Sequence, residues 1–587
     1  MQTVEKAQVI KVLRSIAVLL QVKGENSFKS RAYEIAADRI AGTQEDLGTL
    51  VIEGRLQEIP GIGSALSEKI SELVRTGRME YYETLKAAYP PGIIELMKVP
   101  DLGPRKAAQL WAELQIGDVD ALEKACKEQK LRGLKGFGEK SEGKILAGIE
   151  VYRRAVAAPD RRRLGEVLSV AEEMLASVKA LPGVKRAALG GSVRRFCETV
   201  SDVDLIASAD PAGPDDVARV MDAFAAHGQV REVLAKGDSK CSVRLFRADL
   251  QVDLRVVPDE DFATALHHFT GSKAHHIRLR GLAQDKGLKI SEWGVHRGDE
   301  KLPVPDEPAL YELLGMQYVP PELREDWGEV EAALKRQLPE DLISISDVTG
   351  NVHSHSTWSD GKSSLEEMAN AARAMGLRYL TVTEHSQSAG YAGGLSYDRL
   401  QQQWEEIDRL NEKLAPHGFR LLKGIESDIL ADGRLDYPDE VLAKLEIVIG
   451  SIHVRHGLDE EAMTRRVLNA FDNPHLHVLG HATGRLINER APYGLKMEAI
   501  FDKAAAKGVA IEVNGSPHRM DIKADYVRMA LQRGVRLVAS TDAHATSELQ
   551  FLTYSVGTAR KGWARRSDIL NTQPADQFVA TLRAMRH

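Results

Sequence analysis

The middle of this chain is organised around Gly191-Ser192-Val193-Arg194-Arg195, which is followed by Asp202-Val203-Asp204-Leu205. Asp202 and Asp204 are two residues apart, so on a strand their side chains point to the same face, about 6–7 Å apart along the backbone. Carboxylates at this spacing can converge on one or two divalent cations. The stretch therefore predicts a strand that carries metal ligands on one face.

A third carboxylate, Asp253, lies in the alternating segment 250–257, which predicts a neighbouring strand. Three carboxylates that hold two Mg²⁺ ions roughly 4 Å apart suit phosphoryl or nucleotidyl transfer. The Gly191-Ser192 turn lets a triphosphate approach the backbone, and the arginine pair 194–195 adds positive charge. The alternative is a pair of surface aspartates beside salt-bridged arginines, which the ordered combination of these residues disfavours.

This region resembles the nucleotidyltransferase motif of the family X DNA polymerases, the relatives of polymerase beta. The resemblance implies that Asp202 and Asp204 bind both catalytic metals. It also implies that Asp253 binds the catalytic metal and helps to activate the primer 3′-hydroxyl. The residues that it assigns to the incoming nucleotide are Gly191, Ser192, Arg195, Phe269 and Gly271.

The segment Phe269-Thr270-Gly271-Ser272-Lys273 resembles the same family, at the helix that covers the nascent base pair. Its aromatic ring and its glycine suit a deoxyribose and leave no room for a 2′-hydroxyl. His268, His276 and Ser201 depart from the family's frequent Tyr, Asn and Gly, which leaves efficiency and fidelity open. The histidine pairs 267–268 and 275–276 are not expected to bind metal, because adjacent helical side chains diverge.

Residues 1–150 are predicted to be helical, with three glycine-containing breaks at 59–63, 99–103 and 134–138. Glycine at such a turn lets backbone N–H groups at a helix N-terminus approach a phosphate closely. The breaks resemble helix-hairpin-helix elements, which hold the DNA backbone without reading sequence. One such turn alone is more often an ordinary helix connection. The expected DNA contacts are Gly61, Gly63, Gly103, Gly136 and Gly138.

The same region resembles the small N-terminal domain of polymerase beta, a 5′-deoxyribose-phosphate lyase. Lys69 falls at the position of the lyase's Schiff-base lysine, and Lys29 and Tyr33 match a 5′-phosphate contact and its neighbour. A lysine that attacks a carbonyl must be neutral, so it needs a lowered pKa. The alternative for Lys69 is an exposed helix lysine near a phosphate.

The region 325–587 is rich in histidine: 12 of the 18 histidines fall at or beyond position 353. Short apolar runs alternate with helical segments, as in βα units that close a barrel. Nearly every run ends in a histidine or a carboxylate, which is where a barrel places its active site. Mixed histidine and carboxylate ligands suit Zn²⁺, Mn²⁺ or Fe²⁺.

This region resembles the PHP (polymerase and histidinol phosphatase) domain, a distorted (β/α)7 barrel with a trinuclear metal cluster. Glu384 stands where the family usually has Asp, at a position that is not itself a ligand. The resemblance implies metal-dependent cleavage of phosphodiesters, as a 3′–5′ exonuclease and in some members at abasic sites. The residues that match its nine ligand positions are His353, His355, Asp360, His385, Glu426, His453, His481, Asp542 and His544.

Composition agrees with a multidomain globular protein. The chain has 587 residues, a net charge of −7 and 43% apolar residues, and three to five domains are expected. No apolar run reaches the roughly 20 residues of a membrane span, and the N-terminus does not resemble a secretion signal. Three cysteines without paired spacing argue against disulfides and favour a reducing cytoplasm.

The expected fold class is therefore multidomain. An α-helical helix-hairpin-helix region precedes an α+β nucleotidyltransferase palm and a C-terminal distorted (β/α)7 PHP barrel. Pro159-Asp160-Arg161-Arg162-Arg163 is interpreted as a hinge. The expected domains are 1–80 (lyase-like, first hairpin), 81–158 (hairpin DNA-binding region), 159–255 (palm), 256–322 (nucleotide-selecting subdomain), 323–346 (linker) and 347–587 (PHP).

The leading hypothesis is a gap-filling polymerase of base excision repair that also trims 3′ ends. Its expected partners are gapped or primer-template DNA and dNTPs, and it is expected to act as a monomer without a membrane. Its expected cofactors are two Mg²⁺ or Mn²⁺ ions in the polymerase site and up to three Mn²⁺, Zn²⁺ or Fe²⁺ ions in the PHP site. The main alternative is a PHP-type nuclease or phosphoesterase whose polymerase core is only a DNA clamp. A DNA-binding scaffold without catalysis would leave both ligand sets without a role.

Overall fold

The computed structural model describes residues 6–42, 47–59, 61–97, 99, 102–157, 161–209 and 214–586. The chain divides into two compact units, Met1–Asp160 and Arg161–His587. Pro60, Pro100 and Asp101 of the predicted turns, and the predicted hinge residues 159–160, lie outside the described residues. Among the described residues, no helix is long and apolar enough to cross a membrane.

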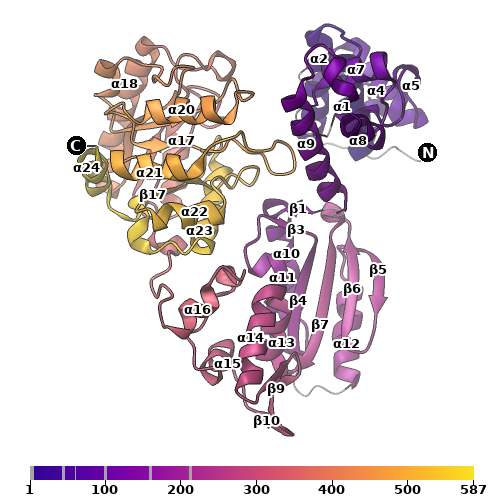
Figure 1. The fold of residues 1–587 in the computed structure, drawn as a ribbon, viewed down its shortest axis with the longest axis vertical. Helices are drawn as coiled ribbons and strands as arrows, with labels where there is room; N and C mark the ends of the chain where they lie inside the picture. The colour runs from indigo at the N-terminus through magenta and orange to yellow at the C-terminus, as the bar shows by residue number, and fades with distance from the viewer. Residues whose placement is uncertain are drawn as a thin grey trace. The chain divides into compact units, whose positions relative to one another are not determined.

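The first unit is helical, as the sequence predicts, and is drawn in indigo and purple in Figure 1. Val9, Leu13, Ile16 and Leu20 recur every three or four residues and are completely buried, as expected for a helix with one core-facing stripe. The elements are α1 (Lys6–Val22), α2 (Ser27–Gly42), α3 (Leu47–Ile52), η1 (Leu56–Glu58), α4 (Ser64–Thr76), α5 (Glu80–Ala87), α6 (Ile93–Leu96), α7 (Pro104–Leu114), α8 (Val119–Lys127), η2 (Lys130–Gly133) and α9 (Glu139–Ala157).

The second unit begins with a five-stranded sheet in the order β2-β4-β7-β6-β5. Strands β4 and β7 are parallel, whereas the pairs β2–β4, β7–β6 and β6–β5 are antiparallel. Figure 1 shows β4, β7 and β6 side by side. The elements are β1 (Arg162–Arg163), α10 (Leu164–Lys179), β2 (Val184–Leu189), α11 (Gly191–Arg194), β3 (Thr199–Val200), β4 (Asp202–Ala209), α12 (Pro214–Ala225), β5 (Val230–Lys236), β6 (Lys240–Leu245) and β7 (Gln251–Pro258).

Helices and a three-stranded sheet, β10-β9-β8, follow the palm. The predicted linker, 323–346, contains a helix and is packed: Arg324 and Glu329 are completely buried. The elements are α13 (Phe262–Thr270), α14 (Lys273–Asp285), β8 (Lys289–Ser291), β9 (Gly294–Arg297), β10 (Glu300–Leu302), α15 (Glu307–Leu313), η5 (Pro321–Leu323) and α16 (Glu329–Leu334).

A buried network of ion pairs connects this region to the palm. Glu307 accepts hydrogen bonds from Arg194 at 2.6 and 3.0 Å and from Arg324 at 2.6 Å. Burial by itself raises the pKa of Glu307, but Arg324 and Arg194 lower it to about 2. The carboxylate is therefore charged in the folded protein, and removing it leaves two guanidinium groups without their shared partner.

Replacing Glu307 with glutamine is expected to destabilise the second unit by about 3–5 kcal/mol, because it breaks a buried ion pair. Since the folded pKa is lowered, the stabilisation by Glu307 is complete above its unfolded pKa and is lost as pH falls through about 2. Urea unfolding of both proteins between pH 5 and 8 should show a constant difference. The same change at exposed Glu300 is the control; equal unfolding midpoints for Glu307→Gln and Glu300→Gln would contradict the assignment.

The C-terminal region is a seven-stranded parallel sheet in sequence order, β11 to β17. A parallel bridge between Ser354 and Ala543 joins the chain after β11 to the chain after β17, so the sheet nearly closes. The predicted fold class is confirmed. The strands are β11 (Gly350–Asn351), β12 (Tyr379–Val382), β13 (Arg420–Asp428), β14 (Ile447–Ser451), β15 (Val478–Leu479), β16 (Ala510–Asn514) and β17 (Leu537–Ser540).

Helices alternate with these strands and pack their apolar faces on the barrel. Met368 of α17 and Ile407 of α18 are almost completely buried in the core that also contains Leu380, Leu421 and Val448 of the strands. The helices are α17 (Leu365–Ala374), α18 (Tyr397–Leu414), α19 (Asp439–Leu442), α20 (Glu460–Ala470), α21 (Met497–Lys507), α22 (Ala524–Gln532), α23 (Leu552–Lys561) and α24 (Ala575–Met585).

Candidate metal centres

The three predicted polymerase carboxylates meet in the palm. Asp202 and Asp204 lie on β4, and the register places Asp204 opposite Asp253 of β7. The pKa of Asp202 is raised, first by burial and then by the charge of Asp253. The pKa of Asp204 is raised to about 6 by burial and by the charges of Asp202 and Asp253. Lys240 Nζ lies 2.5 Å from Asp253 Oδ2 and offsets part of this negative charge. Three neighbouring carboxylates, two of which have a raised pKa, fit one or two divalent cations.

The turn before β4 lies against this cluster. Gly191 has φ +59°, and a Cβ at this position would collide with Oδ2 of Asp204. Only glycine allows α11 to begin this close to the carboxylates. The side chain of Ser192, the next residue, is half-buried in the same turn.

Three further residues predicted to bind the nucleotide, Arg195, Phe269 and Gly271, lie near one another after this turn. Arg195 donates from Nε to Glu325 at 3.1 Å and from Nη1 to the backbone oxygen of Thr270. A Cβ at Gly271 would lie 3.0 Å from Arg195 Nη1, so the glycine leaves room for the guanidinium group. The Arg255 guanidinium stacks 4.1 Å from the centre of the Phe269 ring. The structure therefore brings Arg195, Gly271 and Phe269 to one place.

The four histidines of this region differ in their surroundings. Nε2 atoms of His267 and His275 lie 3.2 and 2.9 Å from the Tyr311 hydroxyl, and His275 Nδ1 lies 2.6 Å from Glu329. The His268 and His276 rings are 4.8 Å apart, and burial lowers the pKa of His276 to about 4. The first two are bonded core residues, whereas His268 of the second pair has its ring 4.9 Å from the Phe269 ring, and burial lowers the pKa of both His268 and His276.

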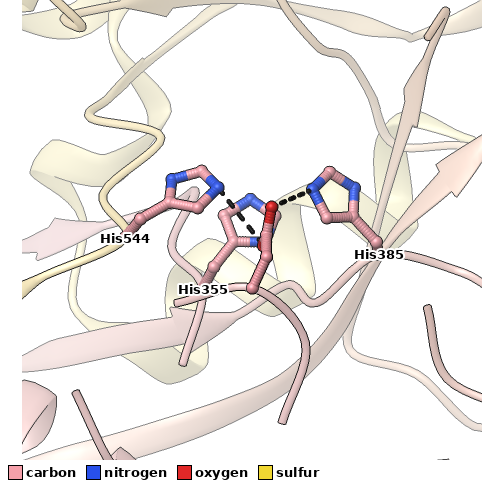
Figure 2. A group of neighbouring side chains, drawn as sticks. His355, His385 and His544 are labelled. Atoms are coloured by element: carbon pink, nitrogen blue, oxygen red, sulfur yellow. Dashed lines mark ion pairs between the residues drawn. The ribbon is translucent and has the colours of Figure 1, made fainter. Parts of the chain in front are cut away.

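The nine predicted PHP ligands converge at the carboxyl ends of the barrel strands. Eight of them form three overlapping groups, and within each group the ligand atoms lie within 4.8 Å of one another. The ninth, His481, has its Nε2 atom 2.9 Å from Glu426. Figure 2 shows three of the histidines, His355, His385 and His544, directed toward one another. The groups are His355, Asp360, His385 and His544; His353, His355 and Asp542; and His385, Glu426 and His453. The groups share His355 and His385, so their donors form one continuous set suited to divalent metal ions.

Glu426 lies at the centre of this cluster. One of its oxygens is 2.9 Å from His481 Nε2 and 3.2 Å from His453 Nε2, and the other is 2.9 Å from His385 Nδ1. Burial by itself raises the pKa of Glu426, but His453, His353 and His385 lower it well below its usual range. The carboxylate is therefore charged and available to bridge ions.

The donor set fits metal ions because several buried ligand atoms have no hydrogen-bond partner among the residues that the structure describes. Buried polar groups normally have one, so these atoms require another ligand. They are His353 Nε2, both ring nitrogens of His355 and His481 Nδ1; His385 Nδ1 and Glu426 Oε2 lie 2.9 Å from each other without hydrogen-bond geometry. Nitrogen and carboxylate donors together suit a transition metal or zinc.

Sequence reasoning missed the carboxylates that orient these ligands. Glu512 Oε1 lies 2.6 Å from His353 Nδ1, and its other oxygen accepts the backbone N–H of His481. Asp428 lies 2.7 Å from His453 Nδ1. Both interactions leave Nε2 of the histidine to face the cluster, as second carboxylates around metal sites commonly do. One feature of the sequence could have identified Glu512: it is a charged residue inside an otherwise apolar strand.

Glu384, the departure from the family's Asp, is completely buried. Its carboxylate accepts hydrogen bonds from the backbone N–H of Ser356 at 3.0 and 3.1 Å and from the hydroxyls of Ser356 and Ser359. The longer glutamate therefore fixes the turn that leads to Asp360.

Replacing Glu512 with glutamine is expected to weaken Mn²⁺ binding about 10–100-fold, because His353 loses the carboxylate that orients its ring. Electron paramagnetic resonance of free Mn²⁺ during titration measures this affinity. Glu498→Gln, an exposed change on α21, is the matched control. Equal Mn²⁺ affinities in both variants would show that Glu512 is not needed to orient His353.

The three candidate lyase residues lie together around one ring in the first unit. Lys69 Nζ lies 4.4 Å and Lys29 Nζ 5.9 Å from the Tyr81 ring centre, and Tyr33 stacks on Tyr81 with centroids 6.0 Å apart. Burial raises the pKa of Tyr33 above its usual range. The arrangement places two cations over adjacent aromatic faces, which is suited to an anionic ligand.

The predicted hairpin glycines lie at exposed turns. Gly63 and Gly103 cap α4 and α7 in extended conformations, and Gly61 and Gly136 have φ +91° and +88°. Within the described part of the chain, a Cβ at Gly63, Gly103 or Gly138 would meet no atom within 4 Å. The fold itself leaves space at these three positions, and a phosphate close to the backbone would use it.

Family descriptions match four parts of the chain. They are a helix-hairpin-helix domain over residues 4–79, a SAM-like helix-hairpin-helix tandem over 93–150, a DNA polymerase beta thumb over 265–325 and a PHP domain over 351–516.

Known proteins match both the whole chain and its parts. A probable phosphatase of Thermoanaerobacter sp. is 27% identical over 38% of this chain and 89% of its own length. DNA polymerase lambda of Rattus norvegicus is 26% identical over 46% of this chain and 48% of its own length. The DNA polymerase/3′-5′ exonuclease PolX of Bacillus subtilis is 38% identical over 98% of this chain and 99% of its own length. Because this last relative matches from end to end, the chain belongs to the family X DNA polymerases that carry a C-terminal PHP domain.

Proposed function

We propose that this protein is a DNA-directed DNA polymerase that fills short gaps in base excision repair, and that its barrel is a metal-dependent 3′–5′ exonuclease. The observation that carries the proposal is that one chain brings carboxylates together on two strands of the palm and brings histidines and carboxylates together in the barrel. The end-to-end relative named DNA polymerase/3′-5′ exonuclease PolX supports the same pair of activities.

In the proposed polymerase site, Asp202, Asp204 and Asp253 hold two Mg²⁺ or Mn²⁺ ions, and Arg195 orients the triphosphate. The bound metals supply charge stabilisation during nucleotidyl transfer. The Phe269 ring and Gly271 position the deoxyribose. The His268 ring lies 4.9 Å from the Phe269 ring and 4.8 Å from the His276 ring, and burial lowers the pKa of both histidines. The pair is proposed to affect fidelity.

In the proposed exonuclease site, the nine barrel ligands hold up to three Mn²⁺, Zn²⁺ or Fe²⁺ ions, so Mn²⁺ is expected to serve both sites. The substrates are gapped or primer-template DNA and dNTPs, and the protein is proposed to act as a cytoplasmic monomer. The hairpin glycines and Lys29 are proposed to hold the DNA backbone. Lys69 is proposed as the Schiff-base lysine of a lyase, which borohydride trapping on DNA with a 5′-deoxyribose phosphate tests.

The test uses a 5′-labelled primer in a one-nucleotide gap that carries a 5′-phosphate, with Mn²⁺. The expected result is extension by one nucleotide with dNTPs and stepwise shortening without them. Shortening under both conditions would instead favour the alternative, a nuclease that keeps its polymerase core as a DNA clamp. Absence of both activities would overturn the proposal.

A further inference from the structure

Lys561, the last residue of α23 in the barrel, lies against the turn that contains Arg195. Its Nζ donates to the backbone oxygen of Arg195 at 2.9 Å and lies 2.5 Å from Glu325 Oε1. Only 8% of Lys561 is exposed, so its ammonium group is largely removed from water. The barrel therefore supplies a buried positive charge next to the proposed triphosphate site.

The contact is built by more than one residue of α23. A Cβ at Gly557 would collide with the Phe196 ring, so the helix packs closely on the residue after Arg195. Arg560 Nε donates to Glu322 at 2.9 Å. These contacts hold the end of α23 in place and fix the position of Lys561.

Glu325 is shared between the two cations. Arg195 Nε donates to Oε1 of Glu325 at 3.1 Å, the same oxygen that Lys561 contacts. Burial tends to raise the pKa of Glu325, but Lys561 and then Arg195 lower it, so the carboxylate is charged. One negative charge thus faces two positive charges, which leaves one positive charge in excess at this turn.

We propose that Lys561 is a positioning residue of the polymerase reaction: it neutralises Glu325, so that Arg195 remains available for the dNTP triphosphate. The inference rests on the proposed role of Arg195. Without Lys561, Glu325 would be compensated by Arg195 alone. Phosphate oxygens would then have to displace a partly buried carboxylate before they bind the guanidinium group.

The first test replaces Lys561 with methionine, which keeps the apolar stem and removes the charge. The KM for dNTP in gap filling is expected to rise about tenfold, with a smaller change in kcat, since a charged hydrogen bond supports nucleotide binding. Exonuclease activity is expected to stay at the wild-type level. The variant Lys561→Arg keeps the charge, so its KM for dNTP is expected to stay near the wild-type value. Lys523→Met, a change of a barrel lysine paired with Asp525, is the matched control.

The second test separates charge compensation from a packing role. Combining Glu325→Gln with Lys561→Met is expected to return the KM to near the wild-type value, because no carboxylate then competes for Arg195. An unchanged KM in Lys561→Met, or a double variant as impaired as Lys561→Met alone, would overturn the inference while wild-type gap filling stands. A wild-type protein that incorporates no dNTP would overturn the proposed function and this inference with it.

Discussion

An Asp204→Asn variant is expected to lose nucleotide incorporation by a factor of at least about 10³, because metal ions stabilise phosphoryl-transfer charge by several kcal/mol. Its exonuclease activity should remain at the wild-type level. Asp204 lies opposite Asp253, and burial with two neighbouring carboxylates raises its pKa to about 6. The amide keeps the shape of the side chain and removes the charge that attracts the cations.

Single-turnover extension of a primer in a one-nucleotide gap measures this loss, and shortening of the same primer without dNTPs measures the exonuclease. Asp238→Asn, at an exposed position between β5 and β6, is the matched control and should keep both activities. Equal loss of both activities in Asp204→Asn would contradict two separate metal centres.

A His355→Ala variant is expected to show the reverse pattern, with exonuclease activity lowered at least about 10³-fold and gap filling retained. His355 belongs to two of the three ligand groups. Its Nε2 lies 3.3 Å from Asp542 and its Nδ1 lies 3.8 Å from Asp360. Burial, His544 and His385 lower its pKa to about 3, so the ring is neutral and able to bind metal.

Retained gap filling in His355→Ala also reports that the variant is folded. His417→Ala, an exposed change after α18, is the control and should leave the exonuclease unchanged. A His355→Ala protein that still shortens primers at the wild-type rate would show that the barrel cluster is not the exonuclease site.

Patterns local in the sequence predicted which carboxylates and histidines the fold brings close together. Asp202 and Asp204 share a face because side chains alternate along a strand. The barrel histidines were found because each one follows a short apolar run, and parallel strands end at the same edge. The side-chain period of a strand and the order of the elements along the chain are sufficient to predict both features.

The supporting residues were not predictable in this way. Glu512 and His353 are 159 residues apart, and Asp428 and His453 are 25 apart; their contacts depend on which strands become neighbours in the closed barrel. The burial of Arg324 and Glu329 in the predicted linker was likewise not predictable. Charged residues in a connecting segment are expected to be solvated unless their buried partners are known.

By itself, the sequence determined the helical N-terminal region, the Asp-x-Asp strand with its second-strand partner, and the histidine-bearing barrel, since local periodicity specifies each. Only the tertiary structure decided how charges are compensated between elements. Lys561 and Glu325 are 236 residues apart, and neither carries a local signal. The physical reason is that burial makes a charge depend on its partner, and the partner is chosen by packing rather than by position along the chain.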